Sequence, residues 1–356
     1  MSLPSSIQAI AISKTGDFDV IEKKELPFPK SAPGDILVKA GLRPTVVILH
    51  DYGGVNFIDT YFRKGLYKIN EFPFIVGGEG AGTIAALPTG PEIVNNEEYK
   101  KRGYSVGAKV ALYRLGAFAE YASVPWKDVF PIPDSVPLIT AAAAYTQGLT
   151  ALTFVEEAHK VKKGEVILVH TVAGGLGLLF AQLIKARGAT VIGTTSTPEK
   201  AAIARAHGAD HVILYPTEDT AQRVLEITNG EGVHAVFDGV GKDTFELDFK
   251  VLRRKGTLVS VGNASGAVPP FSPLKLAEKN LRLLRPTMGN YITTPEEVRR
   301  YVTELFQLIA DGTLKVNVFK EYPFTGEGVQ QAQKDLTGGK TTGKLVIKIA
   351  DPVLAE

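Results

Sequence analysis

A glycine-rich turn between an expected strand and an expected helix carries the clearest chemistry in this sequence. The apolar run Glu165–His170 predicts a buried strand, and Thr171-Val172-Ala173-Gly174-Gly175-Leu176-Gly177 follows it before an apolar helical segment. Such a turn lets the backbone approach a pyrophosphate, and the helix N-terminus offers free N–H groups. Gly174 and Gly177 fit the last two glycines of G-x-G-x-x-G, with Val172 at the first position. The turn therefore predicts a dinucleotide site.

The residues after the second expected strand indicate which dinucleotide is bound. NAD sites usually carry an acid about 20 residues after the glycine turn, where it binds the ribose 2′-hydroxyl. Here residues 194–197 are all hydroxyl residues, without a carboxylate at the strand tip. Ser196 can donate a hydrogen bond to a 2′-phosphate and Lys200 can supply positive charge, whereas Glu199 is expected to face away at a helix start. The pattern favours NADPH.

Strands and helices alternate through the middle of the chain, which predicts a doubly wound parallel sheet. We expect this domain at residues 149–288, with β-rich residues 1–148 before it and residues 289–356 returning to the first domain. The expected strands are 165–170, 190–194, 211–214, 234–238 and 256–261, and the expected helices are 177–186, 199–206, 221–228 and 245–252.

Short apolar runs separated by glycine and proline predict strands in the first domain. These strands are Ile7–Ile12, Asp35–Lys39, Ala81–Leu87 and Ala108–Tyr113. The polar stretch Gly90–Gly103 is expected to be a surface loop. Ala141–Glu157 and Pro295–Ala310 are expected to be helices, and Lys344–Ile349 a late strand.

Composition excludes several kinds of chemistry. The 356 residues contain no cysteine, which rules out disulfides, thiol nucleophiles and cysteine-held zinc, and the six histidines are scattered. The net charge of +2 gives no strong attraction to nucleic acid or membrane. The N-terminal residues do not resemble a signal peptide, and we find no apolar run approaching about 18 residues. We expect a cytoplasmic protein without a bound metal.

Several segments together resemble one protein family. The segment Asn56-Phe57-Ile58-Asp59-Thr60-Tyr61, followed by Gly65-Leu66-Tyr67, is similar to the signature of the quinone oxidoreductases related to zeta-crystallin, which are zinc-independent medium-chain dehydrogenases/reductases. The segments 173–177, 238–244, 262–266 and 285–286 extend the resemblance. The long loop 95–104 is most similar to fungal members.

The resemblance implies an α/β fold made of a GroES-like β-rich catalytic domain plus a doubly wound parallel Rossmann domain. It also implies NADPH as cofactor, a quinone as substrate, and a homodimer joined near Gly256–Val261 and the segment after it. The residues implied to line the nicotinamide and quinone pocket are Asn56, Tyr61 and Tyr67. The residues implied to hold the cofactor, besides Gly174, Gly175, Leu176 and Gly177, are Gln147, Thr150, Ser196, Lys200, Tyr215, Val240, Asn263, Ser265, Arg285 and Lys344.

The sequence departs from the family pattern at two places. About ten extra residues, Gly41–His50, are expected to form a surface bulge, because loop insertions cost little. Val172 and Gln147 stand where relatives often have Ala and Lys, which predicts altered cofactor affinity rather than lost binding.

A reductase without a metal requires a substrate that already accepts electrons readily. A quinone meets this need, with Asn56 donating its amide to the carbonyl oxygen and Tyr61 and Tyr67 stacking and hydrogen-bonding. An enoyl or alkenal double-bond reductase on the same scaffold is one alternative. Binding of AU-rich RNA through the cofactor groove is another, although the near-neutral charge and the lack of an RNA-binding motif weigh against it.

Overall fold

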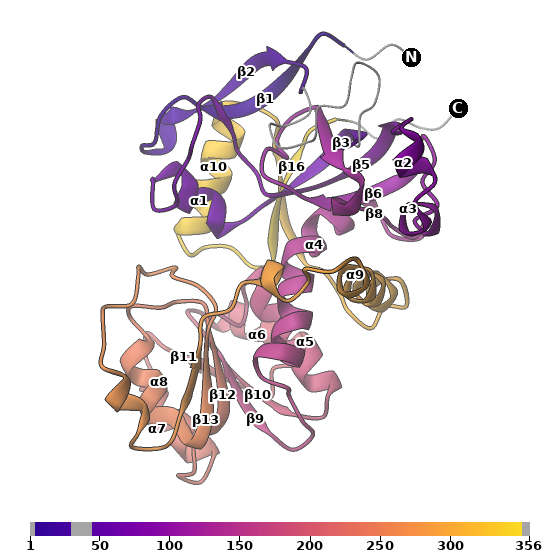
Figure 1. Cartoon of the computed structure of the whole chain (residues 1–356). Coiled ribbons are helices and arrows are strands. Elements are labelled where there is room, and N and C mark those ends of the chain that lie inside the picture. The colour runs from indigo at the N-terminus through magenta and orange to yellow at the C-terminus, as the bar shows by residue number, and fades with distance from the viewer. Residues whose placement is uncertain (1–3, 30–44, 351–356) are drawn as a thin grey trace. The chain divides into compact units, whose positions relative to one another are not determined.

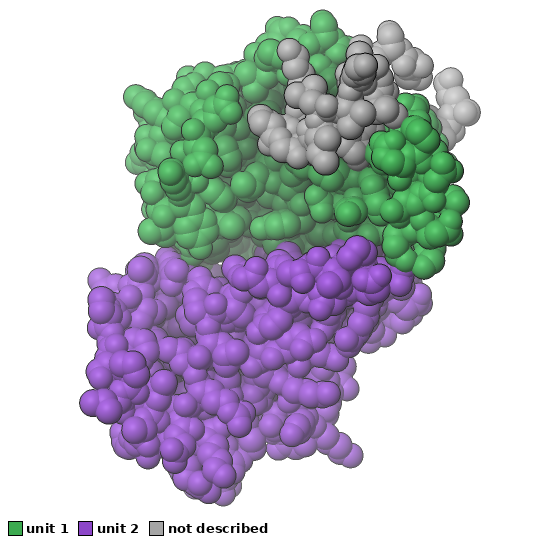
Figure 2. Space-filling view, viewed as in Figure 1, with its two compact units in different colours: residues 1–146, 318–356 green, residues 147–317 purple. Residues whose placement is uncertain are grey.

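The computed structural model describes residues 4–29 and 45–350, which form two compact units (Figures 1 and 2). Unit 1 takes in residues 1–146 and 318–356, and unit 2 takes in residues 147–317. The sequence analysis ended the second domain at residue 288, whereas unit 2 continues to Asn317. It continues because helix α9 (Pro295–Ala310) packs within unit 2, where Leu305 lies against Gly148 and the Tyr301 hydroxyl donates to Glu157.

A six-stranded parallel sheet forms the centre of unit 2, as the alternation of strands and helices predicts. Its order is β11-β10-β9-β12-β13-β14, so the direction of winding reverses beside β9, where open α/β sheets bind ligands. The strands are β9 (Val166–Val169), β10 (Thr190–Thr195), β11 (His211–Leu214), β12 (Val233–Asp238), β13 (Leu252–Ser260) and β14 (Arg282–Leu284).

Helices cover both faces of this sheet (Figure 1). Figure 1 shows α7 and α8 on one side and α5 on the other. The apolar strand residues are buried against them; Phe180 of α5, for example, lies 4.7 Å from Phe237 of β12 between ring centroids. The helices are α5 (Gly175–Ala186), α6 (Pro198–Ala206), α7 (Thr220–Ile227) and α8 (Phe245–Val251), with short helical turns at η4 (Pro273–Leu276) and η5 (Met288–Asn290).

Unit 1 contains two sheets. The larger has the order β15-β16-β3-β5-β6-β8 with β7 also paired to β3, and the smaller has the order β2-β1-β4. Its strands are β1 (Ser6–Ile12), β2 (Ile21–Pro27), β3 (Thr45–Val55), β4 (Phe74–Ile75), β5 (Glu79–Ala86), β6 (Lys109–Tyr113), β7 (Tyr121–Pro125), β8 (Val129–Pro131), β15 (Val318–Pro323) and β16 (Lys344–Lys348). Its helices include α1 (Phe57–Arg63), α10 (Gly326–Thr337) and the short turns η1 (Phe18–Val20) and η2 (Trp126–Asp128).

Strand β3 corrects the expectation of a surface bulge at residues 41–50. Residues 45–50 begin the central strand of the larger sheet, with Val46 and Ile48 fully buried. Burying such side chains contributes about 2 kcal/mol each, so this segment belongs to the core. Residues 41–44 and the strand expected at 35–39 lie outside the described residues.

The stretch 90–103 is also not the surface loop that its polarity suggested. It forms two short helices, α2 (Pro91–Val94) and α3 (Glu97–Lys101), capped by Gly90 and Asn96. Tyr99 of α3 is buried, and its ring lies 5.6 Å from that of Trp126, edge to face. One aromatic side chain therefore ties this polar stretch to the core.

The longest apolar helical segment runs over residues 138–158. Helix α4 (Leu138–Thr153) continues into a π-helical turn, η3 (Phe154–Ala158), and the division between the units falls within α4. Among the described residues, this one segment is long and apolar enough, by length and composition, to cross a membrane. Since 72% of its apolar window is buried in the fold, we describe it as a core helix.

Candidate functional site

The glycine turn of unit 2 has the geometry that a dinucleotide needs. After β9, Thr171 takes a positive φ of 53°, and α5 begins at Gly175 with Gly174 as its N-cap. A Cβ on Gly177 would lie 2.5 Å from the Thr171 carbonyl oxygen, so only glycine allows this close packing of helix on strand. Leu176 and the two glycines before it are partly exposed at the helix N-terminus, which leaves that end open to an anion.

The structure explains why Val172 can replace the first glycine of the pattern. Its side chain is buried and fills the space beside Gly193 of β10, where a Cβ would lie 2.4 Å from a Val172 methyl group. The Val172 side chain therefore points away from the exposed turn. Gln147 lies over Gly175, whose Cβ would be 2.4 Å from the Gln147 amide oxygen, and Thr150 follows one helical turn later.

The tip of β10 brings together three residues expected at the 2′-phosphate. Ser196 and Lys200 are half-buried at the start of α6, and burial lowers the pKa of Lys200. Tyr215, which is exposed, follows β11 and donates its backbone N–H to the Thr195 carbonyl at 3.2 Å. Glu199 is exposed, and its own backbone N–H and the Thr197 hydroxyl lower its pKa. As expected, the Glu199 carboxylate interacts with the N-terminus of its own helix.

The loops after β12 and β13 bring the remaining expected residues of unit 2 together. The Ser265 hydroxyl donates to the Val240 carbonyl at 2.9 Å, and Asn263 lies in the same turn. One nitrogen of Arg285 donates to the carbonyls of Ser260 and Val261 at 3.1 and 2.9 Å. This guanidinium therefore holds the end of β13.

A buried network beneath these loops was not found from the sequence. His170 lies 3.0 Å from the Thr194 hydroxyl through Nδ1 and 2.9 Å from Asp248 through Nε2. Asp238 accepts bonds from the backbone N–H groups of Val240 and Gly241. Ligand atoms of His170, Asp238 and Asp248 lie within 4.8 Å of one another, a spacing that could hold a metal. Their hydrogen bonds join β10, α8 and the turn after β12, which gives them a structural role.

In unit 1, Asn56 has a different role from the one expected. Its Nδ2 donates to Glu79 Oε1 at 2.6 Å and to the Gly54 carbonyl at 3.4 Å, and its Oδ1 accepts from Lys344 Nζ at 2.7 Å. Both ends of the amide are thus engaged inside the fold, rather than directed at a substrate carbonyl. The bonds among these side chains hold the end of β3 to β5 and β16.

Lys344 was expected in the cofactor groove, but it lies in unit 1 and its ammonium is bonded to Asn56 and Glu79. The side chains of Lys344 and Glu79 are 1% and 0% exposed. Glu79 also accepts the backbone N–H of Thr146 at 2.7 Å. This buried ion pair escaped the sequence analysis because its partners are 265 residues apart.

The two expected tyrosines lie together beside this network. The rings of Tyr61 and Tyr67 are 5.5 Å apart, edge to face, and both side chains are partly exposed. Tyr113 of β6, which the sequence did not single out, is 37% exposed. Burial raises its pKa, and Glu79, Asp59 and Tyr67 raise it further.

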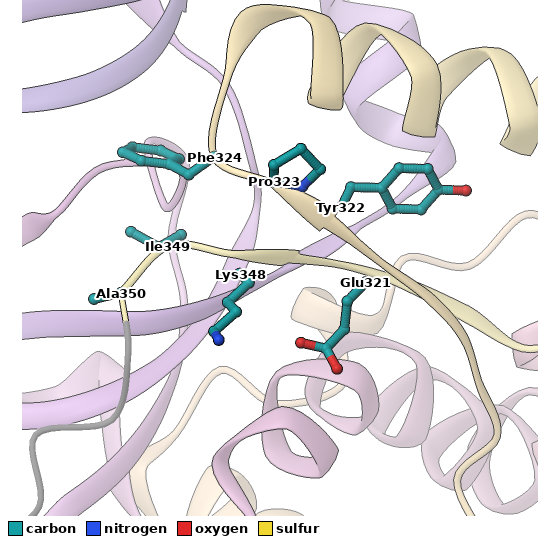
Figure 3. A pocket seen from close by; sticks show the side chains of 7 residues that line it. All are labelled: Glu321, Tyr322, Pro323, Phe324, Lys348, Ile349 and Ala350. Atoms are coloured by element: carbon teal, nitrogen blue, oxygen red, sulfur yellow. The ribbon is translucent and has the colours of Figure 1, made fainter.

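A shallow pocket elsewhere in unit 1 contains none of the expected site residues. It lies on β15 and β16, whose Glu321 and Lys348 line it together with Tyr322, Pro323, Phe324, Ile349 and Ala350 (Figure 3). Tyr322 donates its hydroxyl to Asp335 at 2.7 Å, a bond within unit 1. We therefore do not assign the chemistry to this pocket.

Two family models match the chain. The alcohol dehydrogenase GroES-like domain matches residues 43–134, and the zinc-binding dehydrogenase domain matches residues 175–307. A probable quinone oxidoreductase of Schizosaccharomyces pombe is 38% identical over 340 residues, which cover 95% of this chain and 96% of that protein. The chain belongs to the quinone oxidoreductase family. This assignment makes it an oxidoreductase of the medium-chain dehydrogenase/reductase type, as the sequence predicts.

Two further relatives differ in the activity that their names give. A 2-haloacrylate reductase of a Burkholderia species is 32% identical over 350 residues, covering 96% of this chain and 98% of that protein. The structure of Escherichia coli quinone oxidoreductase complexed with NADPH superposes with a TM-score of 0.84, at 32% identity, covering 96% of this chain and 99% of that chain. The fungal resemblance noted in the sequence agrees with the S. pombe relative.

Proposed function

We propose that this oxidoreductase reduces quinones with NADPH and without a metal ion. The observation that carries the proposal is the tip of β10, where Ser196 and Lys200 follow the glycine turn along the chain and Glu199, in the first turn of α6, serves its own helix. A 2′-phosphate suits this combination, because a lysine and a hydroxyl attract it and a carboxylate at the same place would repel it. The related E. coli enzyme was solved with NADPH, which supports the same cofactor here.

The residues of unit 2 fit a dinucleotide. Gly174, Gly175 and the N-terminus of α5 would hold the pyrophosphate, since side chains larger than hydrogen would meet the Thr171 carbonyl or the Gln147 amide. Ser196, Lys200 and Tyr215 would hold the 2′-phosphate and adenosine. Val240, Asn263 and Ser265 would line the other half of the groove. When bound, NADPH supplies the hydride, and the protein positions it.

The network around Asn56 supports a mechanism without zinc. A catalytic zinc would need cysteine or histidine ligands at this place. The chain has no cysteine, and here the ammonium of Lys344 neutralises Glu79 instead. A substrate that accepts electrons without a Lewis acid, such as a quinone, matches this arrangement. Tyr61 and Tyr67, with their paired rings, would contact it.

Reduction of an activated double bond is the second candidate, favoured by the similarity to 2-haloacrylate reductase. The two activities differ in their products, a hydroquinone or semiquinone in one case and a saturated carbonyl compound in the other. NADPH oxidation should therefore be followed with a benzoquinone, an alkenal and 2-chloroacrylate in parallel, with products identified by mass spectrometry.

The same assay tests the metal-free mechanism. We expect quinone turnover to be unchanged after dialysis against a chelator, and metal analysis of active protein to find no stoichiometric zinc. Loss of turnover on chelation, restored by zinc, would contradict the mechanism. Turnover of 2-chloroacrylate alone would move the assignment to the second candidate.

A further inference from the structure

Two buried carboxyl groups of unit 1 have unequal surroundings. Glu79 accepts three hydrogen bonds, from Asn56 Nδ2, Lys344 Nζ and the Thr146 N–H. Asp59 of α1 is 2% exposed and accepts one, from the Asn56 backbone N–H at 2.8 Å. Its Oδ1 is buried without a hydrogen-bond partner among the described residues. Such a difference in environment divides two neighbouring acids into one that is ionised and one that keeps its proton.

The local charges lead to the same division. Lys344 of β16 supplies one positive charge, and its ion pair with Glu79 of β5 neutralises it. A second carboxylate would leave an uncompensated buried charge, which costs more than keeping a proton. Burial, together with the charge of Glu79, raises the pKa of Asp59 to about 7, although the Asn56 N–H and the Lys344 ammonium act to lower it.

Tyr113 connects this proton with the surface of unit 1. A Cβ on Gly78 would lie 3.8 Å from Tyr113 Cε2, the ring carbon next to the hydroxyl-bearing one, and 3.9 Å from Asp59 Oδ1. The unpartnered carboxyl oxygen and the phenol end of Tyr113 therefore border the same residue. Tyr113 is 37% exposed, so part of this residue is open to solvent while its Cε2 lies near the buried acid. A phenol can accept one proton while it donates its own.

We propose that Asp59 holds the proton that quinone reduction consumes and passes it outward through the Tyr113 hydroxyl; this role rests on the function proposed above. When bound, NADPH would supply two electrons and one hydrogen nucleus, so one further proton is needed at a hydroquinone oxygen. Asp59 Oδ1 has no direct partner among the described residues, so the proton passes through a water molecule between the two side chains. Tyr113 gives its hydroxyl proton to the hydroquinone oxygen and takes a proton from this water, which takes the proton of Asp59; the O–H bond of Asp59 breaks to leave a carboxylate. Asp59 regains a proton from solvent. Overall, NADPH, a quinone and one solvent proton become NADP⁺ and a hydroquinone.

The first test compares Asp59→Asn with Asp51→Asn. Asp51 is a matched control, since it is 1% exposed and burial raises its pKa to about 6. We expect kcat of the unmodified protein with a benzoquinone to fall as the pH rises through about 7. Asp59→Asn should lose this inflection and at least about tenfold of kcat at pH 6, because general acid catalysis contributes at least that much. Asp51→Asn should keep the inflection.

Tyr113→Phe tests the route. It should lower kcat several-fold while NADPH affinity, measured by fluorescence titration, stays unchanged. Full turnover by Tyr113→Phe, or an unaltered rate and pH profile in Asp59→Asn, would overturn the proposal.

Infrared difference spectra between about pH 5 and pH 9 locate the proton without any turnover. A protonated-carboxyl band that titrates near pH 7 should be present in the unmodified protein, in Asp51→Asn and in Tyr113→Phe, and absent in Asp59→Asn. Persistence of that band in Asp59→Asn would overturn the assignment. Absence of quinone turnover by the unmodified protein would overturn the proposed function and this role with it. The infrared titration distinguishes that result from a wrong assignment of the proton.

Discussion

Lys200 is the residue on which cofactor choice depends most directly. Its half-buried position on α6, next to Ser196, suits a phosphate on the 2′-oxygen and gives nothing to a bare hydroxyl. Lys200→Ala should therefore weaken NADPH binding at least about tenfold, or ~1.4 kcal/mol, and leave NADH binding nearly unchanged. Fluorescence titration with both cofactors measures this. Glu199→Ala is the matched control and should change both affinities little; equal losses for both cofactors in Lys200→Ala would contradict the role of the lysine.

The buried pair of Lys344 and Glu79 makes a sharp prediction about stability. Lys344→Met leaves the Glu79 charge buried without its partner, which should lower the free energy of unfolding by about 3–5 kcal/mol. Adding Glu79→Gln removes the orphaned charge and should recover most of that loss. Denaturant unfolding of the two single variants and the double variant gives the coupling directly. Additive losses in the double variant would show that the two groups are independent.

Gly177 fixes how closely helix α5 packs against the turn that follows β9. A Cβ there would meet the backbone of Thr171 and Val172 at 2.5 and 2.7 Å, and backbone cannot move aside cheaply. Gly177→Ala should therefore shift α5 away from β9, lower stability by about 1–3 kcal/mol and weaken NADPH binding. Gly289→Ala is the control, since nothing lies within 4 Å of its added Cβ. Thermal melts with and without NADPH measure both effects, and a fully stable Gly177→Ala protein would contradict the packing argument.

The elements of unit 2 could be predicted from the sequence because buried parallel strands are apolar throughout and the helices between them keep their own period. Strand β3 could not. Its second half contains His50, Asp51, Gly53 and Gly54, which do not resemble a buried strand. The glycines are there because a Cβ on Gly53 would meet Phe118 at 2.6 Å and one on Gly54 would meet Glu79 at 2.5 Å. Such contacts come from residues distant in the sequence, so no local pattern reveals them.

The candidate site divides in the same way. The glycine turn and the β10 tip are each a short continuous segment, so their chemistry can be inferred from residue spacing alone. Asp59, Glu79 and Tyr113 interact only after β5, β6 and β16 come together in the fold, so sequence spacing does not reveal them. The family signature predicts Asn56 as a site residue, whereas its bonds to Glu79 and Lys344 become visible only in the fold.

The whole molecule is expected to be a dimer, and the structure refines the surface involved. From the sequence we expect the contact at the strand near 256–261 and the segment after it; in the structure, β14 pairs with β13 and forms the last strand at that edge of the parallel sheet. An edge strand offers unpaired backbone groups to a second copy, and Leu274, 81% exposed, lies in the segment before it. Light scattering at micromolar concentration should give twice the chain mass. Leu274→Glu should weaken the dimer, whereas a monomer in the unmodified protein would contradict this expectation.

Strand β16 has a consequence for how the protein is made. It pairs with β3, and its first residue, Lys344, neutralises Glu79, yet it follows Glu79 by 265 residues in the chain. During synthesis the ribosome releases residues 147–317, with all six strands of the parallel sheet, before residues 344–348 emerge. Domains usually fold in the order of their translation. Here the unit that starts first must wait for the second to be made, with its central strand open on one side and a buried acid lacking its counter-charge until residues 344–348 have been synthesised.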